Sequence, residues 1–324
     1  MRKRFEYVDI AKGFGIVLVV CSHTDALSMM WLFMGMFVPI FYFCSGYTYS
    51  MKYSLKVSIY NRFRRLLVPY LFFNALMFCA FWHFSIRELL GVIYSRYCLY
   101  PLEETPNIKF LTSGNYPMWF LTSMFVSYLL FLLIVQYEKN RNYIITSYIL
   151  LTFLLQYCPI LLPWSIDTAF LTSLFMYAGM KVRKNKWIDT FRLWQIVLLG
   201  LIYIVFQIEG GDINISVRMY GTSIMIYLFM GILGSVVVLW ISRHFEKTII
   251  GKLFGELGRH SLCIFCIEVF FIVWTKELYS ILWPDVTLGH IAGIIEIIAA
   301  LLGGWLVSKL IHRSRSLTHL VFAS

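Results

Sequence analysis

The sequence predicts an all-α protein, a polytopic membrane helix bundle of about ten transmembrane helices that forms a single domain over residues 1–324. Hydrophobic residues make up 60% of the chain and charged residues only 14%, whereas soluble domains carry about 25% charged residues. Aromatic residues reach 18%, which is typical of chains with Trp and Tyr at the bilayer interface. Apolar runs long enough to cross a bilayer also recur along the chain.

The distribution of basic residues predicts the orientation of these spans. When the spans are placed in order, 23 of the 28 Lys and Arg residues fall on one side of the membrane. The positive-inside rule therefore predicts an integral protein of the cell (plasma) membrane with both termini in the cytoplasm. Because topology also accounts for the net charge of +11, no nucleic-acid partner is expected. The expected spans are residues 10–29, 31–49, 66–83, 117–137, 143–158, 165–181, 192–208, 220–241, 260–276 and 288–309.

The first expected span carries ionisable side chains at an unusual depth. Lys12 and His23 are eleven residues apart, about three helical turns plus 20°, so both lie on one helix face, which Asp9 shares. Ionisable groups at membrane depth are costly and usually mark functional sites or water-filled cavities. Because neutral imidazole can act as a base or a nucleophile near pH 7, His23 is the candidate catalytic residue. We expect it to line an interior cavity rather than face lipid.

The second and third spans carry a possible helix break and a basic cluster. Gly46 beside Ser45 predicts close backbone approach or a local break in the helix. Arg62 and Arg65 share a helix face just before the third span. They either anchor the chain on anionic lipid or clamp phosphate, which guanidinium groups bind bidentately.

The fourth span and the last two carry the other candidates. Residues 84–116, the longest stretch outside the membrane, lead into Trp119, which is either an interface anchor or a stacking platform for a sugar ring. Glu268 lies two turns into an apolar span, so it requires a partner, water or a proton, and Glu296 poses the same question. The four spans between residues 143 and 241 offer no strong candidate.

The seven cysteines indicate no metal or redox site, because they lie mostly in apolar spans. Cys263 and Cys266 form a C-x-x-C motif that lacks polar surroundings, so they are interpreted as core residues. The sequence does not decide whether Cys98 and Cys158, both expected near the outer face, form a disulfide.

Five short motifs follow one another along the chain: Asp9-x-x-Lys12-Gly13 with His23, Phe43-Cys44-Ser45-Gly46-Tyr47, the basic segment 62–69, Met118-Trp119-Phe120-Leu121, and Ser261-Leu262-x-Ile264-Phe265. In this order and spacing the chain resembles acyltransferase family 3, the integral membrane O-acyltransferases, and in particular its fucose 4-O-acetylase-like branch. The resemblance implies transfer of an acyl group, usually acetyl, from cytoplasmic acyl-CoA to a hydroxyl of an extracytoplasmic sugar or envelope polysaccharide. The family's essential basic residue and histidine fall on Lys12 and His23.

The chain departs from the family pattern at two positions. Many members have Arg at the position of Lys12 and His at that of Glu268. Some members carry an external hydrolase-like domain; this chain ends soon after the last span, so it is expected to act alone or with a separate partner enzyme. The predicted roles are catalysis by His23, Asp9 and Glu268, binding of acetyl-CoA by Lys12, Arg62 and Arg65, and acceptor binding by Trp119, Ser45 and Tyr47.

Two other classes of function remain open. A transporter or flippase of an envelope glycan precursor would also use buried charges and a polar path, although the intramembrane charges are few and no internal repeat is visible. A sensor or scaffold without enzymatic activity is the third class. Movement of a substrate without acylation would favour transport.

Overall fold

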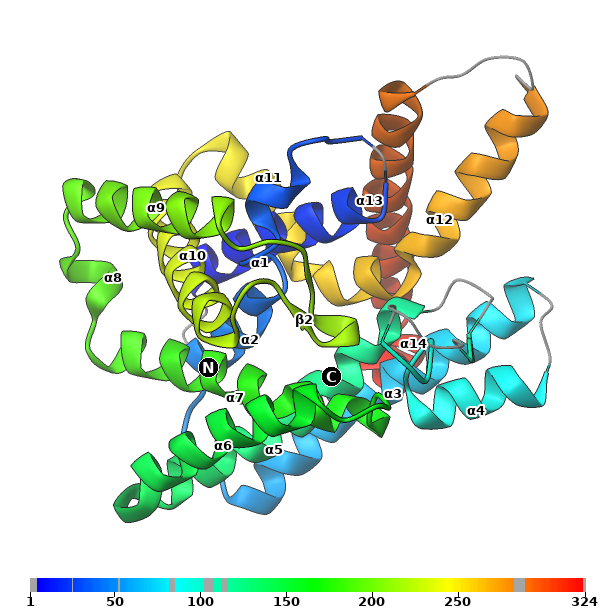
Figure 1. Cartoon of the computed structure of the whole chain (residues 1–324). Coiled ribbons are helices and arrows are strands. Elements are labelled where there is room, and N and C mark those ends of the chain that lie inside the picture. The colour runs from blue at the N-terminus through cyan, green and yellow to red at the C-terminus, as the bar shows by residue number, and fades with distance from the viewer. Residues whose placement is uncertain are drawn as a thin grey trace.

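The computed structural model describes residues 5–24, 26–51, 53–81, 85–101, 108–111, 116–282 and 289–322. Its architecture confirms the all-α class (Figure 1). The α-helices are α1 Glu6–Ser22, α2 Pro39–Tyr47, α3 Leu55–Phe81, α4 Ile86–Tyr94, α5 Trp119–Gln136, α6 Arg141–Gln156, α7 Ile166–Lys184, α8 Trp187–Thr190, α9 Leu193–Ile208, α10 Ile224–Phe245, α11 Ile249–Arg259, α12 Ser261–Leu282, α13 His290–Arg313 and α14 Arg315–Phe322.

Shorter elements join these helices. A hairpin between α9 and α10 pairs β1 with β2 in antiparallel register. The short elements are η1 Met30–Phe33, η2 Tyr116–Met118, η3 Glu138–Asn140, η4 Pro163–Ser165, β1 Ile213–Asn214, η5 Ile215–Val217 and β2 Met219–Tyr220.

Several helices have the length and composition of membrane spans. Within the described residues, α3, α5, α10 and α13 are long and apolar enough to cross a bilayer. The pair α11 and α12, bent by 80° at a short break, is a fifth candidate as a broken span or a re-entrant loop. The architecture is therefore that of a multi-pass membrane protein, and the count of about ten spans stays a prediction.

The first two expected spans are shorter in the structure than in the prediction. Helix α1 ends at Ser22, and His23 is its C-cap residue with a non-helical φ of −97° and ψ of 3°. Residues 31–49 do not form one helix, because η1 is followed by a turn and by the nine-residue α2. Pro39 starts α2: it lacks an amide hydrogen and is favoured in the first helical turn.

Elsewhere the helices extend beyond the predicted boundaries. Helix α3 starts at Leu55, so Arg62 and Arg65 lie on the same continuous helix as the expected third span. The expected external stretch 84–116 contains helix α4 and an isolated bridge between Cys98 and Lys109.

Helix α1 lies within the bundle and packs against α2, α10, α11, α12 and α13 (Figure 1). Glycines allow its closest approach, to α11. A Cβ atom on Gly13 would lie 1.9 Å from the carbonyl oxygen of Phe254, and one on Gly258 would lie 1.7 Å from that of Asp9. Neither position can hold a larger residue without separating the two helices.

Glycines also join α2 to α7. A Cβ atom on Gly46 would lie 1.8 Å from the Met176 carbonyl oxygen, and one on Gly179 would lie 2.1 Å from that of Phe43. The close backbone approach predicted at Gly46 is therefore confirmed. This packing fixes α2, which carries Ser45 and Phe41 toward the centre of the molecule.

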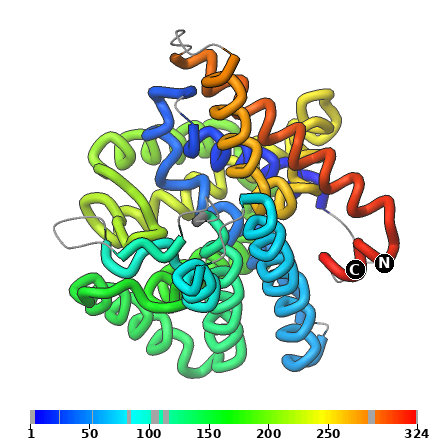
Figure 2. The backbone as a smooth tube through the Cα atoms, turned by 90° about the vertical axis from the view of Figure 1, so that its right-hand side faces the viewer, coloured from blue at the N-terminus to red at the C-terminus, as the bar shows by residue number. Residues whose placement is uncertain are grey.

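The C-terminal helices cover the other side of α1. Helices α12 and α13 run side by side, drawn in orange and red in Figure 2. Helix α14 packs against both α13 and α3. Helix α14 therefore connects α3, which carries Arg62 and Arg65, to α13.

A buried ionic cluster fixes the hairpin between α9 and α10. Asp167 is fully buried and pairs with Arg96 and, at 3.4 Å, with the Nε of Arg218. Arg96 also donates to the carbonyl oxygens of Leu162, at 3.0 Å, and Ser216. The cluster therefore joins the segment after α4, the start of α7 and the hairpin.

Candidate active site

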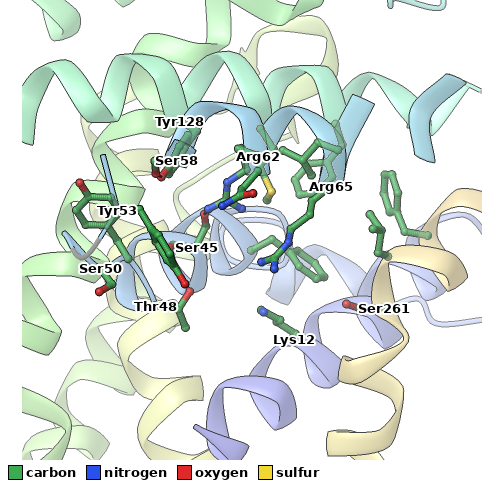
Figure 3. A pocket seen from close by; sticks show the side chains of 18 residues that line it. Lys12, Ser45, Thr48, Ser50, Tyr53, Ser58, Arg62, Arg65, Tyr128 and Ser261 are labelled. Atoms are coloured by element: carbon green, nitrogen blue, oxygen red, sulfur yellow. Dashed lines mark hydrogen bonds between the residues drawn. The ribbon is translucent and has the colours of Figure 1, made fainter. Parts of the chain in front are cut away.

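Lys12, Arg62 and Arg65 come together on the wall of one cavity of about 510 Å³, here called the basic cavity (Figure 3). Lys12 comes from α1 and the two arginines from α3, so fifty residues of sequence separate the two sources. None of the described lining residues is acidic. The other lining residues are Phe41, Ser45, Thr48, Tyr49, Ser50, Tyr53, Ser58, Asn61, Leu66, Phe120, Met124, Tyr128, Ser261, Leu262 and Phe265.

Arg62 is held in a defined orientation inside this cavity. Its Nη2 donates a hydrogen bond of 2.8 Å to the Oγ of Ser45. Its guanidinium carbon lies 4.3 Å from the centre of the Tyr128 ring, a cation–π contact, and the Tyr128 hydroxyl hydrogen-bonds to Ser58. An arginine fixed in this way loses less conformational entropy when it binds an anion.

The start of α12 also lies on the wall of the basic cavity. Ser261 and Leu262, its first two residues, lie on the cavity wall because the chain bends by 80° between α11 and α12. The amide groups of the first helical turn have no partner within the helix, and the helix dipole favours an anion at this end.

His23 lines a second cavity of about 570 Å³, here called the histidine cavity. Its Nδ1 lies 3.0 Å from Oε1 of Glu268, which projects from α12. The Glu268 side chain is fully buried, whereas that of His23 is 21% exposed. The other lining residues are Val19, Ser22, Met34, Phe37, Val38, Phe41, Tyr97, Lys109, Leu111, Pro117, Trp119, Phe120, Ile213, Asn214, Ile215, Ser216, Tyr227 and Phe265.

The His23–Glu268 pair is an arrangement that can perform general acid–base chemistry. In the described part of the chain, no other basic side chain lies within ion-pair distance of Glu268. At 3.0 Å the carboxyl group is close enough to orient the imidazole ring, so that a proton can be taken up and released at a defined place.

Three phenylalanines separate the two cavities. Phe41 of α2, Phe120 of α5 and Phe265 of α12 are common to both walls. The ring centres of Phe41 and Phe120 are 5.7 Å apart in an edge-to-face contact, and those of Phe120 and Phe265 are 5.1 Å apart. The cations and the imidazole thus lie on opposite sides of one layer of aromatic rings.

The structure places the predicted site residues in or beside the basic cavity, in or beside the histidine cavity, and in the core. Lys12, Arg62 and Arg65 lie in the basic cavity, and His23 and Trp119 in the histidine cavity. The set predicted to bind acceptor is therefore not brought together. Ser45 lies with Arg62, and Tyr47 lines neither cavity, since its hydroxyl is 2.8 Å from that of Tyr7 in the core. Asp9 also lines neither cavity, because its backbone packs against Gly258.

The sequence patterns did not single out the polar residues of two loops that line the histidine cavity. Asn214 and Ser216, both in the hairpin, line the histidine cavity together with Tyr97 and Lys109. A polar pair inside the short segment between two apolar spans was the available signal. The described residues contain no group of three or more His, Cys, Asp or Glu that could hold a metal ion, and all seven cysteines are free thiols.

Comparison with known families covers nearly the whole chain. A family model described as an acyltransferase domain matches residues 5–312, which include every residue of the two cavities. No curated protein and no solved structure matches the chain.

Proposed function

Because the chain belongs to the acyltransferase family 3, we propose that it moves an acetyl group from cytoplasmic acetyl-CoA to a hydroxyl of an extracytoplasmic sugar or envelope polysaccharide. The family match supports a membrane O-acyltransferase and gives no support to a transporter or flippase. The observation that carries the proposal is the pair of cavities, one cationic and one with a His–Glu pair, on opposite sides of a single aromatic layer.

The basic cavity suits the nucleotide end of acetyl-CoA. Coenzyme A carries a diphosphate and a 3′-phosphate, and the cavity offers three cations and no acidic residue among its described lining. Arg62 and Arg65 can bind phosphate oxygens bidentately, whereas Lys12 supplies a point charge. The start of α12 supplies further favourable charge. Tyr53, which is 53% exposed, offers a ring against which adenine can stack.

The geometry also suits the reach of the donor. Lys12 and His23 lie eleven residues apart on α1 and its C-cap, about 16 Å along the helix axis. An extended pantetheine arm spans that distance, so phosphates held near Lys12 would leave the thioester close to His23.

The proposed reaction is direct acyl transfer with His23 as general base. His23 takes the proton of the acceptor hydroxyl while the hydroxyl oxygen attacks the thioester carbonyl carbon. The C–S bond then breaks, and the thiolate of coenzyme A takes the proton back from the imidazolium. Glu268 holds the ring and stabilises its positive charge between these steps. Asp9 has no chemical step in this scheme, because it lines neither cavity.

Trp119 and the polar hairpin residues form the proposed acceptor side. Trp119 offers an aromatic face to a sugar ring, and Asn214 and Ser216 offer hydrogen-bonding groups. This side faces outward if the termini are cytoplasmic, as the basic residues predict. We also propose that the protein lies in the plasma membrane, has about ten spans, belongs to the fucose 4-O-acetylase-like branch and acts alone or with a separate partner enzyme.

The test is an acyl-transfer assay on membranes. Membranes that contain the wild-type protein and host envelope glycan are incubated with acetyl-CoA labelled in the acetyl group, and the glycan is analysed by mass spectrometry. We expect labelled ester on the glycan with the wild type and none with His23→Ala. His244→Ala is the matched control, because this exposed histidine of α10 lines neither cavity. Glycan movement without ester formation would instead indicate a transporter.

A further inference from the structure

The layer of Phe41, Phe120 and Phe265 has a place in the proposed reaction that the two cavities alone do not explain. Each ring comes from a different helix, and each forms part of both cavity walls. Each cavity carries polar or charged groups among its lining residues, whereas the layer itself offers only ring carbons. A donor bound in the basic cavity therefore meets an apolar barrier before it reaches His23.

The three rings differ in how firmly the fold holds them. Phe120 is only 8% exposed and contacts Tyr42 and Trp119, with ring centres 5.2 and 6.2 Å away. Phe41 and Phe265 are less buried. Phe120 is therefore the most buried of the three rings, and Phe41 and Phe265 have more room to rotate.

Glycine in α1 makes room for one of the movable rings. A Cβ atom on Gly15 would lie 3.0 Å from Cε2 and 3.1 Å from Cζ of Phe41. The edge of this ring thus rests against the backbone of α1, on the helix that also carries Lys12 and leads to His23.

We infer that Phe41, Phe120 and Phe265 form an acyl-selective passage, through which the thioester end of the donor reaches His23 and whose width excludes long acyl chains. This inference rests on the proposed function. The acyl group precedes the thioester through the passage, so its bulk has to fit between the rings. The histidine cavity of about 570 Å³ has room for a longer chain, and selection therefore occurs at the rings.

The experiment compares acetyl-, butyryl- and hexanoyl-CoA as donors in the transfer assay. We expect the wild type to prefer acetyl-CoA and Phe265→Ala to raise the ratio of hexanoyl to acetyl transfer at least tenfold. Single methylene groups at a shaped site change specificity by about 10- to 200-fold, so an effect of this size is within range. Phe41→Leu widens the passage from another helix and should change the ratio in the same direction.

Phe270→Ala is the matched control, since this residue lies on the same helix as Phe265. Its ring packs against Phe81 and Trp274, with centres 5.8 and 5.4 Å away, and it lines neither cavity. The control should keep the wild-type donor preference. If the Phe265→Ala protein does not accumulate in membranes, the donor preference of Phe41→Leu tests the passage instead.

The outcomes distinguish the passage from the reaction itself. Acetyl transfer by the passage variants with an unchanged donor preference would overturn the passage and leave the proposed function standing. Failure of the wild type to transfer any acyl group would overturn both. Longer chains transferred by the variants, but not by the control, would support the selective passage.

Discussion

Replacing Glu268 with Gln removes the ionisable carboxyl group beside His23 and keeps the shape of the side chain. Glu268 is fully buried with its Oε1 3.0 Å from the imidazole Nδ1, so solvent cannot replace the lost carboxyl group. In a comparable Ser-His-Asp triad the loss of the carboxylate charge lowers kcat by about 10⁴-fold. We expect Glu268→Gln to lower kcat by about 10²- to 10⁴-fold, equivalent to roughly 3 to 5.5 kcal/mol of transition-state stabilisation.

The assay measures initial rates at saturating acetyl-CoA and, separately, equilibrium binding of coenzyme A. Binding should be unchanged, because Glu268 does not line the basic cavity. Glu296→Gln is the matched control. Glu296 is also buried, at 2% exposure, but it accepts a 2.9 Å hydrogen bond from Tyr279 and lines neither cavity. It should retain most of the activity.

Two results would refute this reasoning. A kcat for Glu268→Gln within about threefold of the wild type would show that the carboxylate has no part in the proton transfer. Equal losses of activity in both glutamate variants, together with equal losses of folded protein, would show that Glu268 acts only through packing.

Three further predictions concern donor binding, acceptor binding and the fold. Lys12→Ala should raise the KM for acetyl-CoA by about 10- to 100-fold, because it removes one charge-assisted contact to a phosphate, whereas the KM of Lys12→Arg should stay close to that of the wild type. Equal KM values for Lys12→Ala, Lys12→Arg and the wild type would contradict this role. Trp119→Ala should raise the KM for the glycan about 3- to 10-fold and Trp119→Phe much less, and an unchanged KM would leave Trp119 as an interface anchor. Gly46→Leu should destabilise the protein by at least about 2 kcal/mol, because its side chain would meet the Met176 carbonyl; an unchanged Tm in detergent would count against this packing.

The chain's hydrophobic pattern predicts where helices lie better than where they end. Every expected span contains a helix, because long apolar runs require internally satisfied backbone groups. The hydrophobic pattern does not locate the break before Pro39, since residues 31–49 contain no charged side chain. Nor does it show that η1 and α2 replace one helix there.

The predicted site is partly recoverable from the sequence. Lys12 and His23 stand out because charged and polar groups are rare in apolar spans. The meeting of Lys12 with Arg62 and Arg65 depends on how α1 and α3 pack, which one sequence does not reveal. The same limit applies to Tyr47, whose side chain belongs to the core rather than to a cavity.

The aromatic layer lay beyond sequence reasoning. The chain has 28 phenylalanines, and although Phe120 and Phe265 stand in two of the motifs that carry the family resemblance, nothing in the sequence places them with Phe41 on the walls of two cavities. Their role depends on the meeting of α2, α5 and α12, which is a property of the fold. The hairpin that presents Asn214 and Ser216 is similar, because it depends on the buried Asp167 cluster.

The most direct test of the account is the sidedness of transfer in oriented membrane vesicles. Labelled acetyl-CoA is supplied only to the face that carries the basic cavity, and a glycan acceptor is enclosed on the opposite face. We expect labelled ester on the enclosed glycan with the wild type and none with His23→Ala, while coenzyme A stays on the donor side. Labelled ester that forms only on a glycan supplied to the same face as acetyl-CoA would contradict transfer across the aromatic layer.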